Sequence, residues 1–125
     1  YDKQMEIGLM IATPAAALIS DKLAKEGDFI SIGTNDLSQY TLVVDRTSRN
    51  LTDFFNPHHP AVLKLIQMTV ESAHKAGIWV GMCGELGSDL SITETFLKMG
   101  VDEFSVAPYS VLPLRQQIRG IDLRK

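Results

Sequence analysis

Three polar residues that can bind a phosphorylated anion lie close together in this 125-residue chain. Asn35 and Asp36 follow the apolar run "FISIG", and Arg46 comes ten residues after Asp36. A carboxylate such as Asp36 suits Mg²⁺, which proteins bind through one or two carboxylates together with substrate phosphate. Arginine can hold a phosphate with two hydrogen bonds, and free backbone N–H groups at a strand-to-helix junction attract anions. On spacing alone, a helix cap followed by a solvated arginine explains the same residues.

The only cysteine of the sequence, Cys83, ends a second apolar run within "WVGMCGE". An apolar surrounding favours the neutral thiol, which can act as a proton donor. Gly81 and Gly84 on either side would let a ligand approach the backbone closely. Free cysteine is also among the residue types most often buried as core filler, so the local sequence leaves both interpretations open. A single cysteine excludes an internal disulfide and fits a reducing compartment such as the cytoplasm.

A polar loop, residues 47–59, is longer than a simple connection and could itself be functional. His58 and His59, with Asn56, raise the question of a metal site. Adjacent residues rarely bind one ion with good geometry, and no third ligand is suitably spaced, so an ordinary polar loop is the favoured interpretation.

Short apolar runs alternate with helical patterns along the chain, which predicts parallel βα units and an α/β fold. The segment 5–12 is predicted to be a strand buried on both faces. The other predicted strands are 28–33, 78–84 and 102–108, and the predicted helices are 15–26, 37–46, 60–76, 88–100 and 110–120. Small and polar residues follow each predicted strand, at the edge where parallel α/β folds carry their sites. A closed (β/α)₈ barrel needs roughly 200 residues, so the chain is either a small open sheet or half of a barrel.

Composition excludes several classes of protein. The net charge of −3 argues against a nucleic-acid-binding protein, which would carry a basic surface. No apolar run approaches the roughly 18 residues that a membrane-spanning helix needs. We therefore expect a cytoplasmic protein with no nucleic-acid partner and no membrane insertion.

Three segments together resemble one known family. "IGTNDLSQYTLVVDR", "NPHHPAVLKLI" and "GMCGELGSD" occur here in one order at short intervals. They are similar to the C-terminal phosphoenolpyruvate-binding domain of the enzyme I family of the sugar phosphotransferase system, and the resemblance covers nearly all of residues 1–125. It implies that the chain is the second half of a (β/α)₈ barrel within a larger enzyme.

The resemblance also implies a reaction, a cofactor and partners. Phosphoenolpyruvate, with Mg²⁺, would pass its phosphoryl group to a histidine on a separate domain, which then serves the phosphocarrier protein HPr. The enolate that remains would be protonated to pyruvate. By motif, Asn35 would contact the substrate, Asp36 would bind Mg²⁺ and Arg46 would bind the phosphate. Cys83 would be the proton donor, and the enzyme would be a homodimer.

One position departs from the family pattern. Where the family motif reads approximately "MIETPAAAL", this chain reads "MIATPAAAL", so Ala12 replaces the glutamate implied as the second Mg²⁺ carboxylate. Losing even an outer partner of a metal site costs about 10–100-fold in affinity or activity. We expect the isolated chain to be inactive and to self-associate through its exposed sheet edges. A domain that keeps only an assembly role, or a degenerate homologue, is the alternative.

Overall fold

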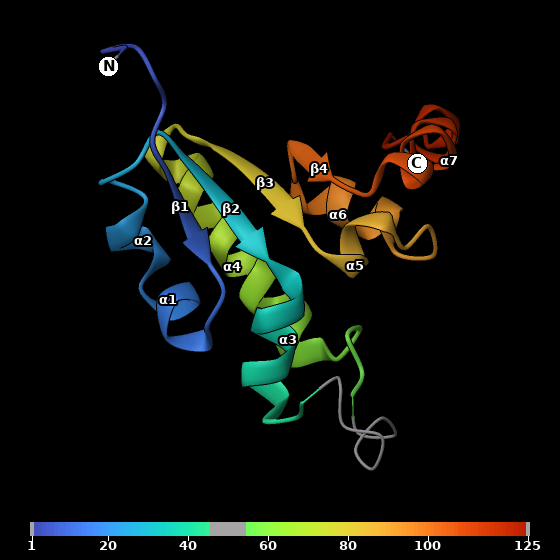
Figure 1. Ribbon diagram of the computed structural model, residues 1–125, viewed down its shortest axis with the longest axis horizontal. Coiled ribbons are helices and arrows are strands. Elements are labelled where there is room, and N and C mark those ends of the chain that lie inside the picture. Colours follow the sequence, from blue (N-terminus) through green and yellow to red (C-terminus); the bar gives the residue numbers. More distant parts are fainter. Residues whose placement is uncertain (1, 46–54, 125) are drawn as a thin grey trace.

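The computed structural model describes residues 2–45 and 55–124. Within these residues the strands form one parallel sheet, in the order β1-β2-β3-β4, from Gly8–Ile11, Phe29–Gly33, Trp79–Cys83 and Glu103–Ser105 (Figure 1). All three strand pairs are parallel. The predicted α/β class and the four strands are therefore confirmed, although each strand is shorter than its apolar run.

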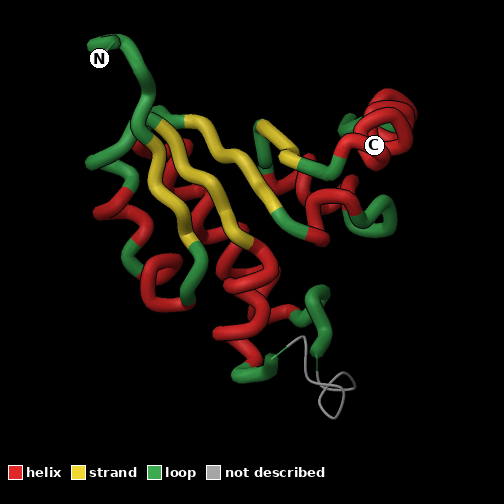
Figure 2. The backbone as a smooth tube through the Cα atoms, in the orientation of Figure 1, coloured by secondary structure: helices red, strands yellow, loops and turns green. Residues whose placement is uncertain are grey.

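Helices connect the strands and pack together on one side of the sheet. They are α1 (Pro14–Leu18), α2 (Ser20–Leu23), α3 (Thr34–Leu42), α4 (Pro60–Ala76), α5 (Glu85–Ser88), α6 (Thr93–Met99) and α7 (Pro108–Gly120). In Figures 1 and 2, α4 crosses behind the strands, whereas no helix of the described residues lies in front of them. The sheet therefore has one covered and one open face.

The covered face forms the hydrophobic core. Alternate strand residues, including Ile30 and Ile32 of β2, are fully buried there, as are Val80 and Met82 of β3. The helix α4 supplies Val62, Ile66, Val70 and Ala73 at the helical period. The helix predicted over residues 60–76 is thus confirmed. Each fully buried aliphatic side chain of this kind contributes about 1.5–3 kcal/mol.

The open face is lined by the other half of each strand. Register places Gly8, Phe29 and Trp79 in one row and Met10, Ser31, Gly81 and Glu103 in the next. The rings of Phe29 and Trp79 stack with centroids 4.4 Å apart. Met10 is 60% exposed, so the prediction that its strand is buried on both faces is wrong. Among the described residues, no element covers that side of β1.

Two predicted helices are each divided in the structure. The segment 15–26 forms α1 and α2, separated at Ile19, whose φ and ψ of −110° and 18° are not helical. Thr13 caps α1, because its hydroxyl accepts a hydrogen bond from the Ala16 N–H at 3.2 Å. The segment 88–100 is also interrupted: Asp89 follows α5 and accepts from the Ser91 N–H instead of capping α6. Short local turns therefore replace continuous helices at both places.

One hydrogen-bonded carboxylate joins α4 to the start of β4. Asp102 Oδ2 accepts from the Val80 N–H at 2.8 Å and lies 2.9 Å from His74 Nε2. Burial raises the pKa of Asp102, but the hydrogen bonds from His74 and Val80 and the charge of His74 outweigh it, so the pKa is lowered. A lowered pKa in the folded state means that ionised Asp102 stabilises the fold.

Asp102→Asn is expected to reduce the free energy of unfolding at pH 7 by about 1 kcal/mol, the usual net value of one hydrogen bond. The contribution is full above the unfolded-state pKa and is lost as pH falls through the lower folded-state pKa. The variant should therefore lose less stability than the parent between about pH 5 and pH 2. Urea denaturation across this range is the measurement, with the exposed Asp21→Asn as control. Parallel curves for Asp102→Asn and the parent would contradict the assignment.

Within residues 2–45 and 55–124, no helix combines the length and the apolar character that crossing a bilayer requires.

Candidate functional site

Three of the residues singled out in the sequence line one pocket at the carboxyl ends of β2 and β3. Asn35, Asp36 and Cys83 border an open pocket of about 290 Å³, together with Met10, Gly33, Thr34 and Gly84. Asn35 and Asp36 begin α3 directly after β2, and Cys83 is the last residue of β3. Gly33 and Cys83 are register partners, so strand pairing alone brings residues 50 positions apart in the chain to the same edge.

The side chain of Asn35 has a defined orientation. Its Oδ1 accepts a hydrogen bond from the Glu85 N–H at 3.1 Å. The Oδ1 atom is thereby fixed as the acceptor, and the Nδ2 group is left as the donor. A donor at this position suits a phosphate or carboxylate oxygen of a ligand.

Gly84 holds this arrangement together. Its φ and ψ are 106° and −176°, a region that is essentially restricted to glycine. A Cβ built on Gly84 would overlap Thr34 Oγ1 and lie 3.1 Å from Asn35 Oδ1. Thr34 in turn donates to the Cys83 carbonyl at 2.9 Å. Glycine is therefore required at this position for two reasons: the backbone conformation has a positive φ, and Thr34 and Asn35 leave no room for a Cβ.

The thiol of Cys83 is half-buried, between a core position and the surface. Its Sγ lies 3.6 Å from the Ile32 carbonyl, to which it can donate, and 3.9 Å from the Ser31 hydroxyl. Both partners belong to β2, the strand that precedes Asn35 in the chain. A thiol held in this way borders the pocket and can deliver a proton to a ligand bound there.

Asp36 is exposed in the first turn of the nine-residue helix α3. This position places a carboxylate at the helix N-terminus, with free N–H groups nearby. Among the described residues, no group of three or more His, Cys, Asp or Glu side chains is arranged to bind a metal ion. Asp36 is therefore a single carboxylate facing solvent, consistent with a site that would depend on substrate and water for its remaining ligands.

Ala12 lies close to Gly33, one of the residues that line the same pocket. A Cβ built on Gly33 would be 3.4 Å from the Ala12 Cβ, and Gly33 lines the pocket. Ala12 is only partly buried, so a longer side chain at this position has space to extend. The departure from the family motif therefore falls beside the pocket instead of at a distant point.

Other predicted site residues lie elsewhere. Arg46 is outside the described residues, as is most of the loop 47–59. His58 Nε2 lies 2.6 Å from Asp89 Oδ2, while His59 Nδ1 accepts from the Ala61 N–H at 3.2 Å and so caps α4. Burial raises the pKa of Asp89, but hydrogen bonds from Ser91 and His58 lower it more, so it lies below its usual value. Each of these two histidines thus has a hydrogen-bond partner in the structure.

The structure adds residues to the site that the sequence did not indicate. Thr34 fixes the Cys83 carbonyl, Ser31 contacts the thiol, and Met10 forms one wall of the pocket. Thr34 stands next to Asn35 in "GTND" and could have been suspected from that alone. Ser31 and Met10 could not, because only the strand register brings them to Cys83.

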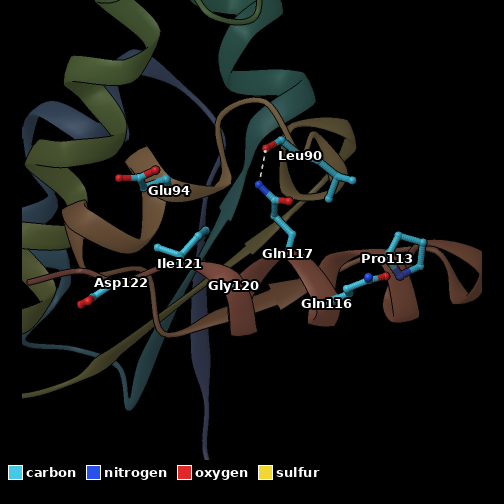
Figure 3. Close-up of a pocket in the computed structure, with 8 residues that line it drawn as sticks. All are labelled: Leu90, Glu94, Pro113, Gln116, Gln117, Gly120, Ile121 and Asp122. Carbon is cyan, nitrogen blue, oxygen red and sulfur yellow. Dashed lines mark hydrogen bonds between the residues drawn. The ribbon is translucent and has the colours of Figure 1, made fainter. Parts of the chain in front are cut away.

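A larger pocket, of about 650 Å³, lies between α6 and α7 (Figure 3). Its wall includes Glu94 and Gln117, and Gln117 Nε2 donates to the Leu90 carbonyl at 3.4 Å. It includes none of Asn35, Asp36 and Cys83. Glu94 pairs with Lys98 at 2.7 Å on the surface. Asp122, the other carboxylate of this pocket, pairs with Arg124 at 3.0 Å. Both carboxylates are therefore engaged in ion pairs, and size alone does not make this pocket the site.

The fold is a parallel βα domain with a candidate pocket at the carboxyl ends of its strands, which is the edge where parallel α/β folds carry their ligand sites. The family described as "PEP-utilising enzyme, PEP-binding domain" matches residues 1–123. The chain belongs to this family.

Individual relatives agree. The chain is 50% identical over 119 residues to a "Phosphoenolpyruvate-protein phosphotransferase" of Buchnera aphidicola from Acyrthosiphon pisum, covering 95% of this chain and 21% of the relative. It is 48% identical over 114 residues to the protein of the same name from Bacillus subtilis, and the match covers 91% of this chain and 20% of that relative. The Haemophilus influenzae protein of this name is 46% identical over 124 residues, which cover 99% of this chain and 22% of the relative. The chain thus spans about a fifth of the length of these curated relatives.

Proposed function

We propose that this chain is the C-terminal segment of a phosphoenolpyruvate–protein phosphotransferase and supplies part of its phosphoenolpyruvate site. The observation that carries the proposal is the gathering of Asn35, Asp36 and Cys83 around one pocket at the carboxyl edge of the sheet. Family membership supports the substrate, and the names of the relatives support the reaction. The proposal includes a barrel whose second half is residues 1–125, in a cytoplasmic homodimer.

Binding of the substrate is the first task of the site. The Nδ2 group of Asn35 donates to an oxygen of phosphoenolpyruvate, since its Oδ1 is already engaged with Glu85. Arg46 holds the phosphate with paired hydrogen bonds. The N-terminus of α3 adds a favourable field for the anion.

The donor set tests whether Mg²⁺ fits. Asp36 supplies one carboxylate, and Mg²⁺ is commonly held by one or two carboxylates together with phosphate oxygens and water. Asp36 therefore suits the ion, while Ala12 leaves the second position without a ligand. The bound ion would neutralise charge that develops on the phosphoryl group.

Transfer and protonation follow. The phosphoryl group passes to a histidine of a separate domain of the same enzyme, from which the phosphocarrier protein HPr receives it. Breaking the bond between phosphorus and the enol oxygen leaves an enolate of pyruvate. The Cys83 S–H then donates its proton to the enolate carbon, which gives pyruvate and a thiolate that solvent reprotonates. The Ser31 hydroxyl and the Ile32 carbonyl position the thiol.

A segment exchange tests these roles in a complete enzyme. Residues 1–123 of this chain, carrying Ala12→Glu, replace the matching segment of the Bacillus subtilis relative. In that background we expect Cys83→Ser to slow pyruvate formation by about 10²–10⁴-fold, the usual contribution of a general acid. Asp36→Asn should weaken the dependence of the rate on magnesium concentration. Asp21→Asn, an exposed carboxylate away from the pocket, is the matched control.

The readouts separate binding from chemistry. Pyruvate formation and labelling of HPr by labelled phosphoenolpyruvate report turnover, while substrate protection of the enzyme against proteolysis reports binding. Normal substrate binding and normal turnover in the Asp36→Asn variant and in the Cys83→Ser variant of the exchanged enzyme would refute the proposed roles.

An assembly role is the second candidate function, and one observation favours it. Large apolar side chains are exposed on the helices that follow the two edge strands, among them Leu18 of α1 at 62% and Tyr109 of α7 at 84%. A chain that keeps these surfaces but lacks the Ala12 carboxylate could serve assembly without catalysis. Normal assembly of the exchanged enzyme without activity, even with Ala12→Glu, would support this alternative.

A further inference from the structure

The open face of the sheet carries one charged side chain. Most strand residues on this open face are apolar or small: Phe29, Trp79, Met10, Ser31, Cys83 and Ser105. Among the strand residues of this face, Glu103 alone is an acidic or basic residue of formal charge. A Cβ built on Gly81 would overlap Oε2 of Glu103. The carboxylate therefore lies flat over the glycine of the neighbouring strand, on the open face itself.

This carboxylate forms no ion pair with a described residue. Among the described residues, Glu103 takes part in none of the ion pairs of the chain, which join His58–Asp89, His74–Asp102, Lys98–Glu94 and Arg124–Asp122. Glu103 is exposed, so water solvates it in the isolated chain. Covering the face would remove that water. An uncompensated buried charge costs several kcal/mol, whereas a partner of opposite charge offsets the cost.

The edges of the sheet indicate what kind of surface covers the face. Strand β1 has no neighbour on one side and β4 has none on the other, within the described residues. Exposed apolar side chains lie on segments that adjoin both edge strands in the chain: Ile7 directly before β1, Leu18 at the end of α1, and Tyr109 and Leu112 on α7, which follows β4. A second parallel sheet of βα units, with the same polarity, would pair with both edges at once and bury both apolar surfaces.

We propose that the open face is completed by a second four-stranded parallel βα sheet that carries a lysine or arginine opposite Glu103. This inference rests on the proposed assignment of the chain to half of a barrel and adds the charge that the other half must bring. Side chains on the inner face of a barrel point toward its axis and pack in layers. A cation from the facing strands can therefore reach the Glu103 carboxylate, which lies over Gly81 in the second row.

A second copy of this chain is the less suitable partner. Related by a two-fold axis along the barrel, two copies would place two Glu103 carboxylates against each other. No lysine or arginine lies on the inner-facing positions of the strands to compensate. Like charges brought together across an interface cost several kcal/mol. Glu103 thus weakens pairing of this chain with itself and favours a cation-bearing half.

A charge-reversal experiment tests this with the chain itself. The variant Glu103→Lys serves as the cation-bearing half, and each protein is labelled with a donor or acceptor fluorophore. Energy transfer and light scattering are measured for the parent alone, for Glu103→Lys alone and for their mixture, without phosphoenolpyruvate or magnesium. We expect the mixed pair to form with a dissociation constant at least about tenfold lower than either self-pair, and salt to reduce the difference.

The controls isolate the open face. Glu26→Lys makes the same change of charge in the exposed turn before β2, and its mixture with the parent should behave like the parent alone. Glu103→Gln, which removes the charge without reversing it, should self-associate more tightly than the parent. If Glu103→Lys does not fold, the comparison of self-association between Glu103→Gln and the parent still tests the inference.

Equal dissociation constants for the parent, Glu103→Gln and the mixture would overturn the inference. Because no substrate is present, that result would be independent of the phosphoenolpyruvate-binding roles tested by the segment exchange.

Discussion

Replacing Ala12 by glutamate is expected to raise kcat/KM of the segment-exchange enzyme for phosphoenolpyruvate by at least about 10–100-fold. Ala12 lies beside Gly33, and Gly33 lines the pocket together with Asp36 and Cys83. A carboxylate there would add a second oxygen ligand for Mg²⁺, which a methyl group cannot supply. The partial exposure of Ala12 leaves space for the longer side chain, so the change should not disturb the core.

The matched control is Ala12→Gln, which has nearly the same size and shape as glutamate but no charge. It should recover little of the activity, since a neutral amide is a weaker ligand for a hard cation. Rates are measured over a magnesium titration, and Ala12→Glu should lower the concentration needed for half-maximal rate. Equal kinetics for the alanine, glutamine and glutamate enzymes would show that position 12 does not bear on the metal. High activity with Ala12 itself would remove the basis for an impaired site.

Gly84→Ala is expected to be among the most destabilising single changes in this domain. The φ of 106° lies in a region where a non-glycine residue costs about 1–3 kcal/mol. The new methyl group would also overlap Thr34 Oγ1 and crowd Asn35 Oδ1, so the hydrogen bond from Thr34 to the Cys83 carbonyl would be strained. Because native domains are stable by only about 5–15 kcal/mol, a combined cost of this size is readily measured by urea denaturation.

Gly77→Ala separates the two contributions. Gly77 also has a positive φ, 79°, but a Cβ there would meet nothing within 4 Å. It should therefore lose only the backbone contribution, about 1–2 kcal/mol. In the exchanged enzyme, Gly84→Ala should raise KM for phosphoenolpyruvate as well, since it displaces the oriented amide of Asn35. A loss of stability no greater than that of Gly77→Ala would show that the contact with Thr34 is unimportant.

The sequence predicted much of this fold because its signals are local. Helix α4 begins at Pro60 and ends before Gly77 with its apolar stripe buried, as the 3.6-residue period indicated. The prediction was wrong where a second element decides the outcome. Met10 was expected to be buried, but burial depends on whether another surface covers the open face. The helix predicted over 15–26 is interrupted at Ile19, and the hydroxyl of the next residue, Ser20, contacts Ser72 of α4 at 2.9 Å.

By itself, the sequence determined the residue types of the site and their order along the chain: Asn35 and Asp36 after one strand, Cys83 at the end of the next, and alanine at position 12. Only the tertiary structure decided that these residues share one pocket, that Asn35 presents its Nδ2 group, and that Glu103 lies over Gly81 on the open face. The physical reason is that strand register and side-chain orientation depend on contacts between residues distant in sequence, such as Gly33 with Cys83 and Gly81 with Glu103. A local pattern carries no information about such pairs.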